Sequence, residues 1–353
     1  MDELYYQAID LLKELISTPS LSREEVHAAD IIQRHLMTNG HSPNRHGNNV
    51  WAVAPDYDPS LPTLLLNSHI DTVKPAAGWT RDPFKPEEDE EGRIYGLGSN
   101  DAGASLVSLI STFLYMSEMP RSYNLIMLAS AEEEISGKNG IESVIPLLPR
   151  VDLAIVGEPT GMNPAIAEKG LMVLDAEVYG VAGHAARDEG DNAIYHAADA
   201  IYTLKNLRLP VVSEMLGHVK ISVTQINAGT QHNVVPDLCR MVVDVRTTDA
   251  YTNVETLELI RAAVPECRFT PRSTRLNPSH ISPDHVIIRR LKMLGYVPFG
   301  SPTLSDQALM PWTSVKIGPG QSSRSHTADE VIFTSEIREA IATYTRILSG
   351  LNL

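Results

Sequence analysis

Two residues that could bind a metal ion end an otherwise apolar segment, TLLLNSHIDTV at residues 63–73. His69 and Asp71 are separated by one residue, so in a strand their side chains point to the same side and Ile70 points to the other. An imidazole that binds a metal ion through one nitrogen commonly donates its other N–H to a carboxylate, which fixes its tautomer. The spacing therefore predicts a metal-ligating His69 that is oriented by Asp71.

Further acidic and imidazole groups fall where strands or tight loops are expected to end: Asp101, the run Glu132, Glu133 and Glu134, then Glu158 and His326. In an open α/β sheet, sites assemble at the carboxyl ends of the strands. Each residue alone has an ordinary explanation; Asp101, for example, could cap the helix that follows it. Together, two imidazoles and several carboxylates form a mixed nitrogen and oxygen ligand set that suits zinc or a similar divalent ion.

The elements around these residues are expected to alternate between strands and helices. Strands are expected at residues 48–56, 62–71, 123–131 and 152–158, and helices at about 2–17, 23–39, 102–117 and 138–147. A short strand at 314–320 and helices at 284–294 and 335–351 continue the same style near the end of the chain. Such alternation predicts a doubly wound α/β domain with a mainly parallel sheet.

The pattern changes near Gly170, where a second domain is expected to be inserted. Strands at 171–180, 217–229, 239–248 and 267–274 and helices at 192–207 and 253–264 follow the order β-α-β-β-α-β. This order matches the ferredoxin-like α+β unit. We therefore expect a discontinuous first domain, residues 1–168 and 282–353, interrupted by a small domain at 169–281.

The composition excludes some classes of function. Lys and Arg total 29 against 44 Asp and Glu, a formal charge of −15; this argues against nucleic-acid binding, which needs clustered Lys and Arg. The apolar runs are too short to span a membrane, and the first residues are typical of an amphipathic surface helix, not a signal peptide. Cys239 and Cys267 are too few for a disulfide framework, so we expect a cytoplasmic protein.

Seven segments, in order, resemble the zinc-dependent M20 family of peptidases and deacylases, especially its acetylornithine deacetylases and succinyl-diaminopimelate desuccinylases. They are SHIDTV, GLGSNDAG, SAEEEISGKNG, IVGEPTG, GVAGHAA, NVVPDLCRMVVDVR and GPGQSSRSHTADE. The resemblance extends over essentially the whole chain. It implies a catalytic domain with an inserted lid domain, a homodimer formed through the lid, and two divalent metal ions, zinc or alternatively cobalt.

The resemblance also implies roles for the residues at the strand ends. His69 and Glu158 would hold one metal ion, and Glu134 and His326 would hold the other. Asp101 would bridge the two ions. Asp71 would orient His69 without binding a metal ion itself. Aligning EEEISG with the family's Asp-Glu-Glu segment makes Glu133 the general base. A register shifted by one residue, with Glu132 as the base and Glu133 as the ligand, stays open.

Residues of the inserted domain and of a late glycine-rich loop match family positions that meet the substrate. His184 would contact the scissile carbonyl from the partner subunit, and Asn233 and Arg246 would meet the substrate's α-carboxylate, which suits the planar fork of Arg. Gly318 and Gly320 could let the backbone approach a ligand closely, or could simply turn the chain.

The function implied is hydrolysis of the amide bond of an N-acyl amino acid, with N-acetylornithine and a place in arginine biosynthesis as the first expectation. A succinyl group would need a further cation, for which Arg187 and Arg324 are candidates. The family's lysine after the bridging aspartate is replaced by Gly103, which puts any role of that lysine in doubt. Alternatives are a di- or tripeptidase, a succinyl-diaminopimelate desuccinylase, or a binding protein that keeps the scaffold without catalysis; the last is disfavoured because every ligand position and a base are filled.

Overall fold

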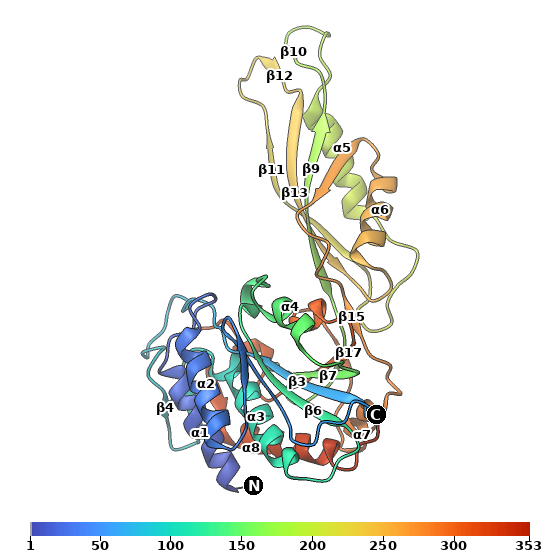
Figure 1. Ribbon diagram of the computed structural model, residues 1–353. Coiled ribbons are helices and arrows are strands. Elements are labelled where there is room, and N and C mark those ends of the chain that lie inside the picture. Colours follow the sequence, from blue (N-terminus) through green and yellow to red (C-terminus); the bar gives the residue numbers. More distant parts are fainter. Residues whose placement is uncertain (1) are drawn as a thin grey trace. The chain divides into compact units, whose positions relative to one another are not determined.

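The computed structural model describes residues 2–353 as two compact units, which are described separately (Figure 1). Unit 1 comprises the chain up to Ile166 together with Ile281–Phe299 and Ser305–Leu353. Unit 2 comprises Ala167–His280 and Gly300–Leu304.

The centre of unit 1 is a mainly parallel sheet. Its strands lie in the order β1 (Asn44–His46), β2 (Asn49–Val53), β6 (Asn124–Ser130), β3 (Thr63–His69), β7 (Leu153–Val156) and β17 (Thr313–Lys316). The four strands from β6 to β17 are parallel, whereas β1 and β2 are antiparallel to their neighbours. Beyond β17, β8 (Ala165–Glu168) leads into unit 2 and pairs with β15 (Ser279–His280) and β16 (Phe299–Ser301). The mixed α/β fold with a mainly parallel sheet is thus confirmed.

Both faces of this sheet are covered, because side chains along each strand alternate between two cores. Leu64 and Leu66 of β3 belong to the larger core, whereas Leu65 belongs to a smaller core with Ile126 and Ile141. The larger core also takes in α1 (Asp2–Ile16), α2 (Val26–Thr38), α3 (Ala104–Ser117), α7 (Val286–Met293) and α8 (Thr334–Leu348). The smaller core is covered by α4 (Ile141–Val144). This is the doubly wound arrangement expected from the sequence.

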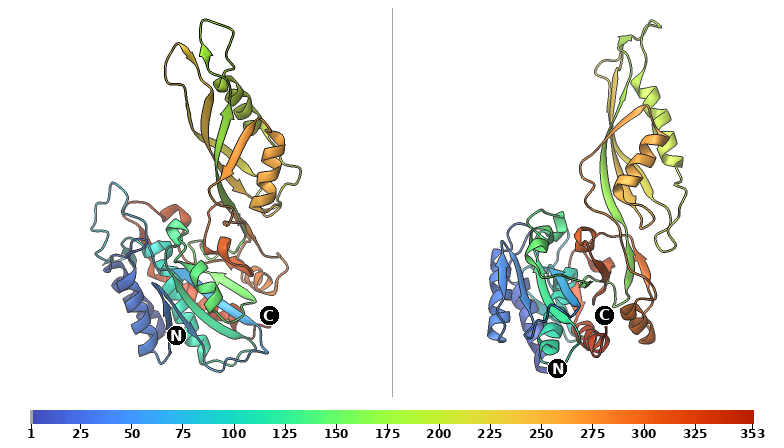
Figure 2. Two further views of the ribbon diagram at one scale, coloured as in Figure 1. Left: turned by 45° about the horizontal axis from the view of Figure 1, so that its top comes forward. Right: turned by 45° about the vertical axis from the view of Figure 1, so that its right-hand side comes forward.

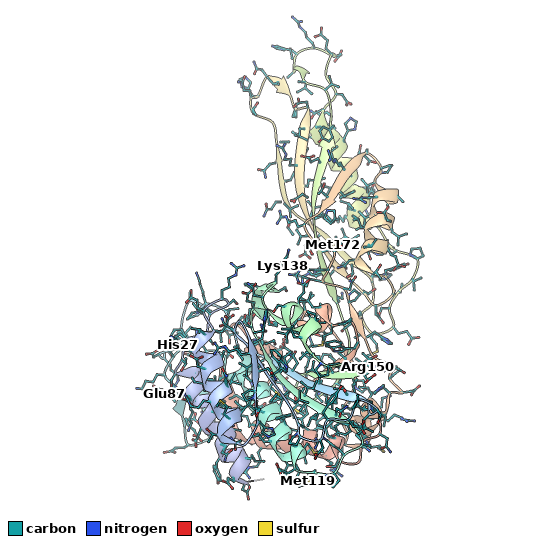
Figure 3. The ribbon with its side chains drawn as sticks, viewed as in Figure 1. His27, Glu87, Met119, Lys138, Arg150 and Met172 are labelled. Atoms are coloured by element: carbon teal, nitrogen blue, oxygen red, sulfur yellow. The ribbon has the colours of Figure 1, made fainter. Side chains whose placement is uncertain are left out.

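Unit 2 has the ferredoxin-like order expected of the insert. Its antiparallel sheet has the order β11 (Lys220–Ala228), β13 (Leu238–Thr247), β9 (Gly170–Tyr179) and β14 (Cys267–Pro271). Helices α5 (Ala193–Asn206) and α6 (Asn253–Ala263) cover one face, and alternate residues of β9, such as Met172, are buried beneath them (Figures 2 and 3). A two-stranded pair, β10 (Gly183–His184) and β12 (Val234–Val235), extends from one end of this sheet (Figure 1).

Some elements differ from the expectation. A small sheet of β18 (Val331–Phe333), β5 (Arg93–Tyr95) and β4 (Glu87–Glu88) was not anticipated. The helix expected from residue 102 begins at Ala104, after an irregular turn at Ser99–Gly103, and no side chain caps it. Asp101 therefore does not act as its N-cap. Among the described residues, none of the helices has the length and apolar character needed to cross a membrane.

Candidate metal centre

Three neighbouring parallel strands direct candidate ligands to one edge of the sheet of unit 1. His69 is the last residue of β3, Glu133 and Glu134 form a short turn after β6, and Glu158 lies two residues beyond the end of β7. The strand ends are aligned, since His69 pairs with Ser130 in the ladder. Two loops from elsewhere in unit 1, carrying Asp101 and His326, complete the cluster.

The described residues form three groups of possible ligand atoms: two share Asp101, and the third joins His69 with Glu133 and Glu134. In the first group, His69 Nε2 lies 3.4 Å from Asp101 Oδ1 and 3.8 Å from Glu158 Oε1. In the second, His326 Nε2 lies 3.5 Å from Asp101 Oδ2 and 3.1 Å from a carboxylate oxygen of Glu134. Ligand atoms bound tetrahedrally at zinc distances lie about 3.3 Å apart. The spacing of both groups therefore fits a divalent ion, with one oxygen of Asp101 available to each.

Asp71 connects His69 to the glutamate turn. Its carboxylate accepts hydrogen bonds from the N–H groups of Glu133 (3.0 Å) and Glu134 (3.1 Å) and from the Ser22 hydroxyl (2.7 Å). His69 Nδ1 lies 2.9 Å from the Asp71 backbone carbonyl and 3.5 Å from its carboxylate. The main acceptor for His69 is thus the carbonyl of Asp71, not the carboxylate expected from the spacing, because β3 ends at His69 and the next two residues leave the strand. Either way Nδ1 faces an acceptor, which directs Nε2 toward the cluster.

The glutamate run divides between two roles. Glu134 contacts His326, and Glu133 Oε2 lies 4.0 Å from His69 Nε2, so both reach the cluster. Glu132 has a left-handed backbone conformation (φ 55°), and its side chain accepts a hydrogen bond from the Asn139 amide at 2.9 Å. Its carboxylate is therefore engaged by the loop that follows, and this geometry favours the register in which Glu133 and Glu134 are the functional pair.

The cluster carries more negative charge than its own histidines balance. Burial raises the pKa of Glu133 and of Glu158 well above the ordinary value; His69 opposes this and nearby carboxylates add to it. Burial alone would lower the pKa of His69, but Asp101 and Asp71 outweigh it and raise that pKa well above its usual range. A cation would relieve the repulsion among these carboxylates. The donor set and its charge thus fit one or two divalent ions.

Two further buried carboxylates, Glu330 and Asp306, lie near the cluster, and the sequence analysis predicts no role for either. Glu330 ends the segment GPGQSSRSHTADE that carries His326, whereas Asp306 lies in none of the seven segments. Glu330, 2% exposed, accepts the N–H groups of Gly98 (3.1 Å), Asn100 (2.9 Å) and Asp101 (2.8 Å). Burial raises the pKa of Glu330 to about 8, and the negative charge of Asp101 adds to this effect. The three backbone hydrogen bonds act in the opposite direction. Asp306, 4% exposed, accepts the Ser130 hydroxyl at 2.5 Å, and burial raises its pKa to about 6.

Gly318 and Gly320 let their loop pack closely against other segments of the protein, not against a ligand. A Cβ on Gly318 would lie 2.5 Å from the Glu158 carbonyl oxygen. Gly320 has φ +83°, and a Cβ there would lie 2.3 Å from the Asn100 side chain. Both glycines therefore pack the loop against the segments that carry Glu158 and Asp101. Gly103 is similarly confined, since a Cβ would lie 2.5 Å from the Gly98 carbonyl oxygen, which explains why no lysine occupies this position.

The candidate residues of unit 2 separate into two places. His184 pairs with Val234 across β10 and β12, and the Asn233 carbonyl accepts the Ala185 N–H at 3.0 Å, so His184 and Asn233 lie close together. Arg246 lies near the opposite end of β13, where Asp244 accepts hydrogen bonds from its guanidinium at 2.9 and 3.2 Å. Within one chain, the structure does not bring Asn233 and Arg246 together.

The two arginines considered for a succinyl group are both near carboxylates. Arg324 donates to Glu336 at 2.7 Å. Arg187 lies 3.8 Å from Glu189 on the surface. The charge of Arg324 in particular is already balanced.

Comparison with solved structures places the fold among metallopeptidases and related hydrolases. An aminopeptidase of Bacillus cereus matches with a TM-score of 0.79 at 18% identity, covering 98% of each chain. A protein of Bacillus subtilis described as a dinuclear metal-binding peptidase of the M20 family matches with a TM-score of 0.76 at 18% identity, covering 99% of this chain and 100% of that one. At these identities the likeness concerns the fold alone.

Curated relatives match at somewhat higher identity. An acetylornithine deacetylase of Proteus mirabilis is 28% identical over 358 residues, covering 92% of this chain and 91% of that one. A succinyl-diaminopimelate desuccinylase of Paracoccus denitrificans is 30% identical over 215 residues, 57% of this chain and 56% of that one. The model of peptidase family M20/M25/M40 matches residues 65–350. The chain therefore belongs to this family of hydrolases.

Proposed function

We propose that this protein hydrolyses the amide bond of an N-acyl amino acid, with N-acetylornithine as the first candidate substrate, and that it uses two divalent metal ions, preferably zinc. The observation that carries the proposal is the pair of ligand groups that share Asp101. His69, Asp101 and Glu158 would hold one ion, and Asp101, Glu134 and His326 the other; cobalt suits the same ligands.

The chemistry follows from the residues around these groups. When bound, divalent ions supply Lewis-acid chemistry that lowers the pKa of water and polarises an amide carbonyl. Glu133, beside His69 and free of the hydrogen bonds that hold Glu132, would take a proton from the attacking water and return it to the departing amine. Asp71 would keep His69 and the turn of Glu133 and Glu134 in register with one another.

The choice of substrate rests on the relatives. The acetylornithine deacetylase of Proteus mirabilis matches over almost the full chain, which favours N-acetylornithine, ornithine release and a cytoplasmic step of arginine biosynthesis. N-succinylornithine and succinyl-diaminopimelate are the next candidates, because a desuccinylase also matches, although over a shorter segment. A di- or tripeptidase is the remaining candidate, since a tripeptidase of Staphylococcus aureus shares the fold at a TM-score of 0.76.

Unit 2, the inserted domain, would act as a lid and form a homodimer. Its edge strand β11 has no neighbour on its outer side among the described residues, and α5, which contacts β11, exposes Ile194, Tyr195 and Tyr202. Unpaired edges and exposed apolar side chains are features of interaction surfaces. A second copy would also explain the separation of Asn233 from Arg246, because β13 spans roughly 25 Å between them. Each substrate site would then combine the metal ligands and Arg246 of one subunit with His184 and Asn233 of the other subunit.

The test is a panel of substrates supplied to one preparation. Release of ornithine from its N-acetyl and N-succinyl derivatives is compared with hydrolysis of dipeptides and succinyl-diaminopimelate, before and after chelation and after zinc or cobalt is restored. We expect activity on an N-acyl amino acid that is lost with chelation and recovered with metal. A protein that binds two metal ions yet hydrolyses none of these amides would contradict the proposal and favour a binding role.

A further inference from the structure

A groove of about 400 Å³ in unit 2 is lined by basic side chains. It lies between the end of α5, the loop that follows it and the start of β11, and all its lining residues belong to unit 2. Five of them carry or can carry positive charge: Lys169, Lys205, Arg208, His218 and Lys220. The buried side chains of Leu204, Leu216 and Val219 also line the groove and give it an apolar part.

No carboxylate lines this groove, although the whole chain carries a formal charge of −15. Elsewhere the arginines are often paired, as in Arg45 with Asp30 or Arg272 with Asp175. In contrast, none of the groove's basic side chains forms an ion pair within the described part of the chain. Among the side-chain hydrogen bonds of residues 2–353, the one from these basic groups goes from Arg208 to the Leu207 backbone carbonyl. The groove is therefore positively charged, although the chain as a whole is strongly negative.

Lys169 and Lys220, two lysines that line one end of the groove, repel each other; the nearby Arg246 lies outside the groove and is paired with Asp244. Lys220 pairs with Arg246 in the β-ladder, and side chains directly opposite each other in a ladder share a face. Burial, and then the charges of Lys220 and Arg246, lower the pKa of the nearby Lys169 ammonium group. A groove lined by one sign of charge concentrates its field and attracts ions of the other sign. A bound anion would offset this repulsion.

We propose that the groove binds a small organic anion that carries either two carboxylate groups or a phosphate group. The volume is within the range of small-molecule sites. Several basic side chains around an apolar surface suit a ligand with separated charges on a short carbon body. The inference does not depend on amide hydrolysis, because no residue of the metal cluster contributes to the groove. The basic side chains of the groove have no carboxylate partner among the described residues and can bind an anion, whereas Arg324 is already paired with Glu336.

Calorimetric titration of the full-length protein tests this, with inorganic phosphate, succinate and, as a singly charged control, acetate. Each titration is done with and without metal, because an anion bound at the metal centre would be lost on chelation whereas one in the groove would remain. We expect metal-independent binding of phosphate or succinate that is stronger than binding of acetate. Lys220→Gln and Arg208→Gln each remove one exposed positive charge. Each should weaken the metal-independent binding of the anion about tenfold, the size expected for the loss of one hydrogen bond to a charged group.

Lys292→Gln is the matched control, since Lys292 is an exposed lysine of unit 1 whose ammonium group donates a hydrogen bond to the Pro283 carbonyl. It should leave the affinity unchanged, and sedimentation should show the same oligomeric state for all variants. Stronger binding of phosphate than succinate would identify a phosphate ester as the ligand type, and the reverse a dicarboxylate. Absence of metal-independent binding at millimolar concentrations, or affinity unaffected by both groove substitutions, would overturn the proposal. Neither result would bear on amide hydrolysis.

Discussion

At the scale of single residues, the glutamate run gives the sharpest test of the proposed chemistry. The Glu133 carboxylate lies 4.0 Å from His69 Nε2 and accepts no backbone hydrogen bond within the described part of the chain, whereas the Glu132 carboxylate accepts one from the Asn139 side chain. We predict that Glu133→Gln keeps both metal ions but lowers kcat by roughly 10²–10⁴, the usual contribution of a general base. Steady-state kinetics with metal analysis of the same sample measures both effects.

Glu132→Gln is the matched control for this substitution. It should lower stability, because a partly buried hydrogen bond from Asn139 is weakened, while turnover stays close to that of the unmodified protein. If instead Glu132→Gln abolished turnover and Glu133→Gln lost metal, the register shifted by one residue would be correct.

Asp306 provides a prediction about pH. Burial raises its pKa to about 6 from an ordinary value of 3.8, so between these values the folded protein binds more protons than the unfolded chain. Its contribution to the free energy of unfolding therefore falls as pH rises from about 4 to about 6, by up to about 3 kcal/mol. Asp306→Asn removes this effect. In metal-free protein, the Tm of the variant minus that of the unmodified protein should rise between about pH 4 and about pH 7; a difference independent of pH would show that Asp306 does not titrate in this range.

The candidate ligands could be found in the sequence because they either follow apolar runs or lie in distinctive motifs. His69 and Glu158 end such runs, and Asp101 and His326 lie in distinctive glycine- and serine-rich motifs. Glu330 ends the same motif as His326, but its contacts could not be predicted, since its partners are backbone N–H groups more than two hundred positions away in the sequence. Similarly, the bond from His69 to the Asp71 carbonyl depends on where β3 ends, which a period-two pattern does not fix.

At the scale of elements, the turn before α3 is held by one carboxylate. Glu330 accepts hydrogen bonds from the N–H groups of Gly98, Asn100 and Asp101, so it fixes the backbone that carries Asp101, the candidate ligand common to both proposed metal sites. Glu330→Gln replaces one acceptor oxygen by an N–H₂ group that faces donors. We predict a loss of about 1–3 kcal/mol in stability and metal affinity reduced about 10–100-fold, as for other residues that position ligands.

Metal affinity by competition with a chelating dye, alongside thermal unfolding, separates the two effects of Glu330→Gln. Glu336→Gln is the control, because Glu336 accepts the Phe333 N–H at the start of α8 and pairs with Arg324. It should lower stability by about 1 kcal/mol without changing metal affinity. Equal affinity in both variants would limit Glu330 to a role in stability.

Most long elements could be predicted from periodicity, and the short ones could not. The helix expected at residues 138–147 is reduced to Ile141–Val144 followed by a tighter turn, because Pro146 lacks the N–H that a continuing helix needs. The strands β4, β5 and β18 have two or three residues each, too few for alternation to show. They form because distant segments pair, which is a property of the tertiary fold.

At the scale of the whole molecule, the distribution of polar residues over unit 2 is the feature that supports the proposed homodimer. His184 and Asn233 adjoin the pair β10 and β12, and Arg246 is at the other end of β13. If all three meet one substrate, as the family resemblance implies, they come from two subunits. In the proposed dimer, the exposed side chains of α5 and the edge of β11, which is unpaired among the described residues, would be the surfaces on which the two copies join.

Mixed dimers test this arrangement directly. His184→Ala and Glu133→Gln proteins should each be nearly inactive alone, the first for lack of a donor to the substrate carbonyl and the second for lack of a base. When the two are unfolded together and refolded, or co-expressed, a hybrid contains one site with intact Glu133 from the first chain and intact His184 from the second. We therefore predict that mixing restores activity only when subunits can exchange, whereas mixing folded proteins without exchange does not. If His184 acted within its own chain, every site of the hybrid would lack one of the two residues, and no activity would return.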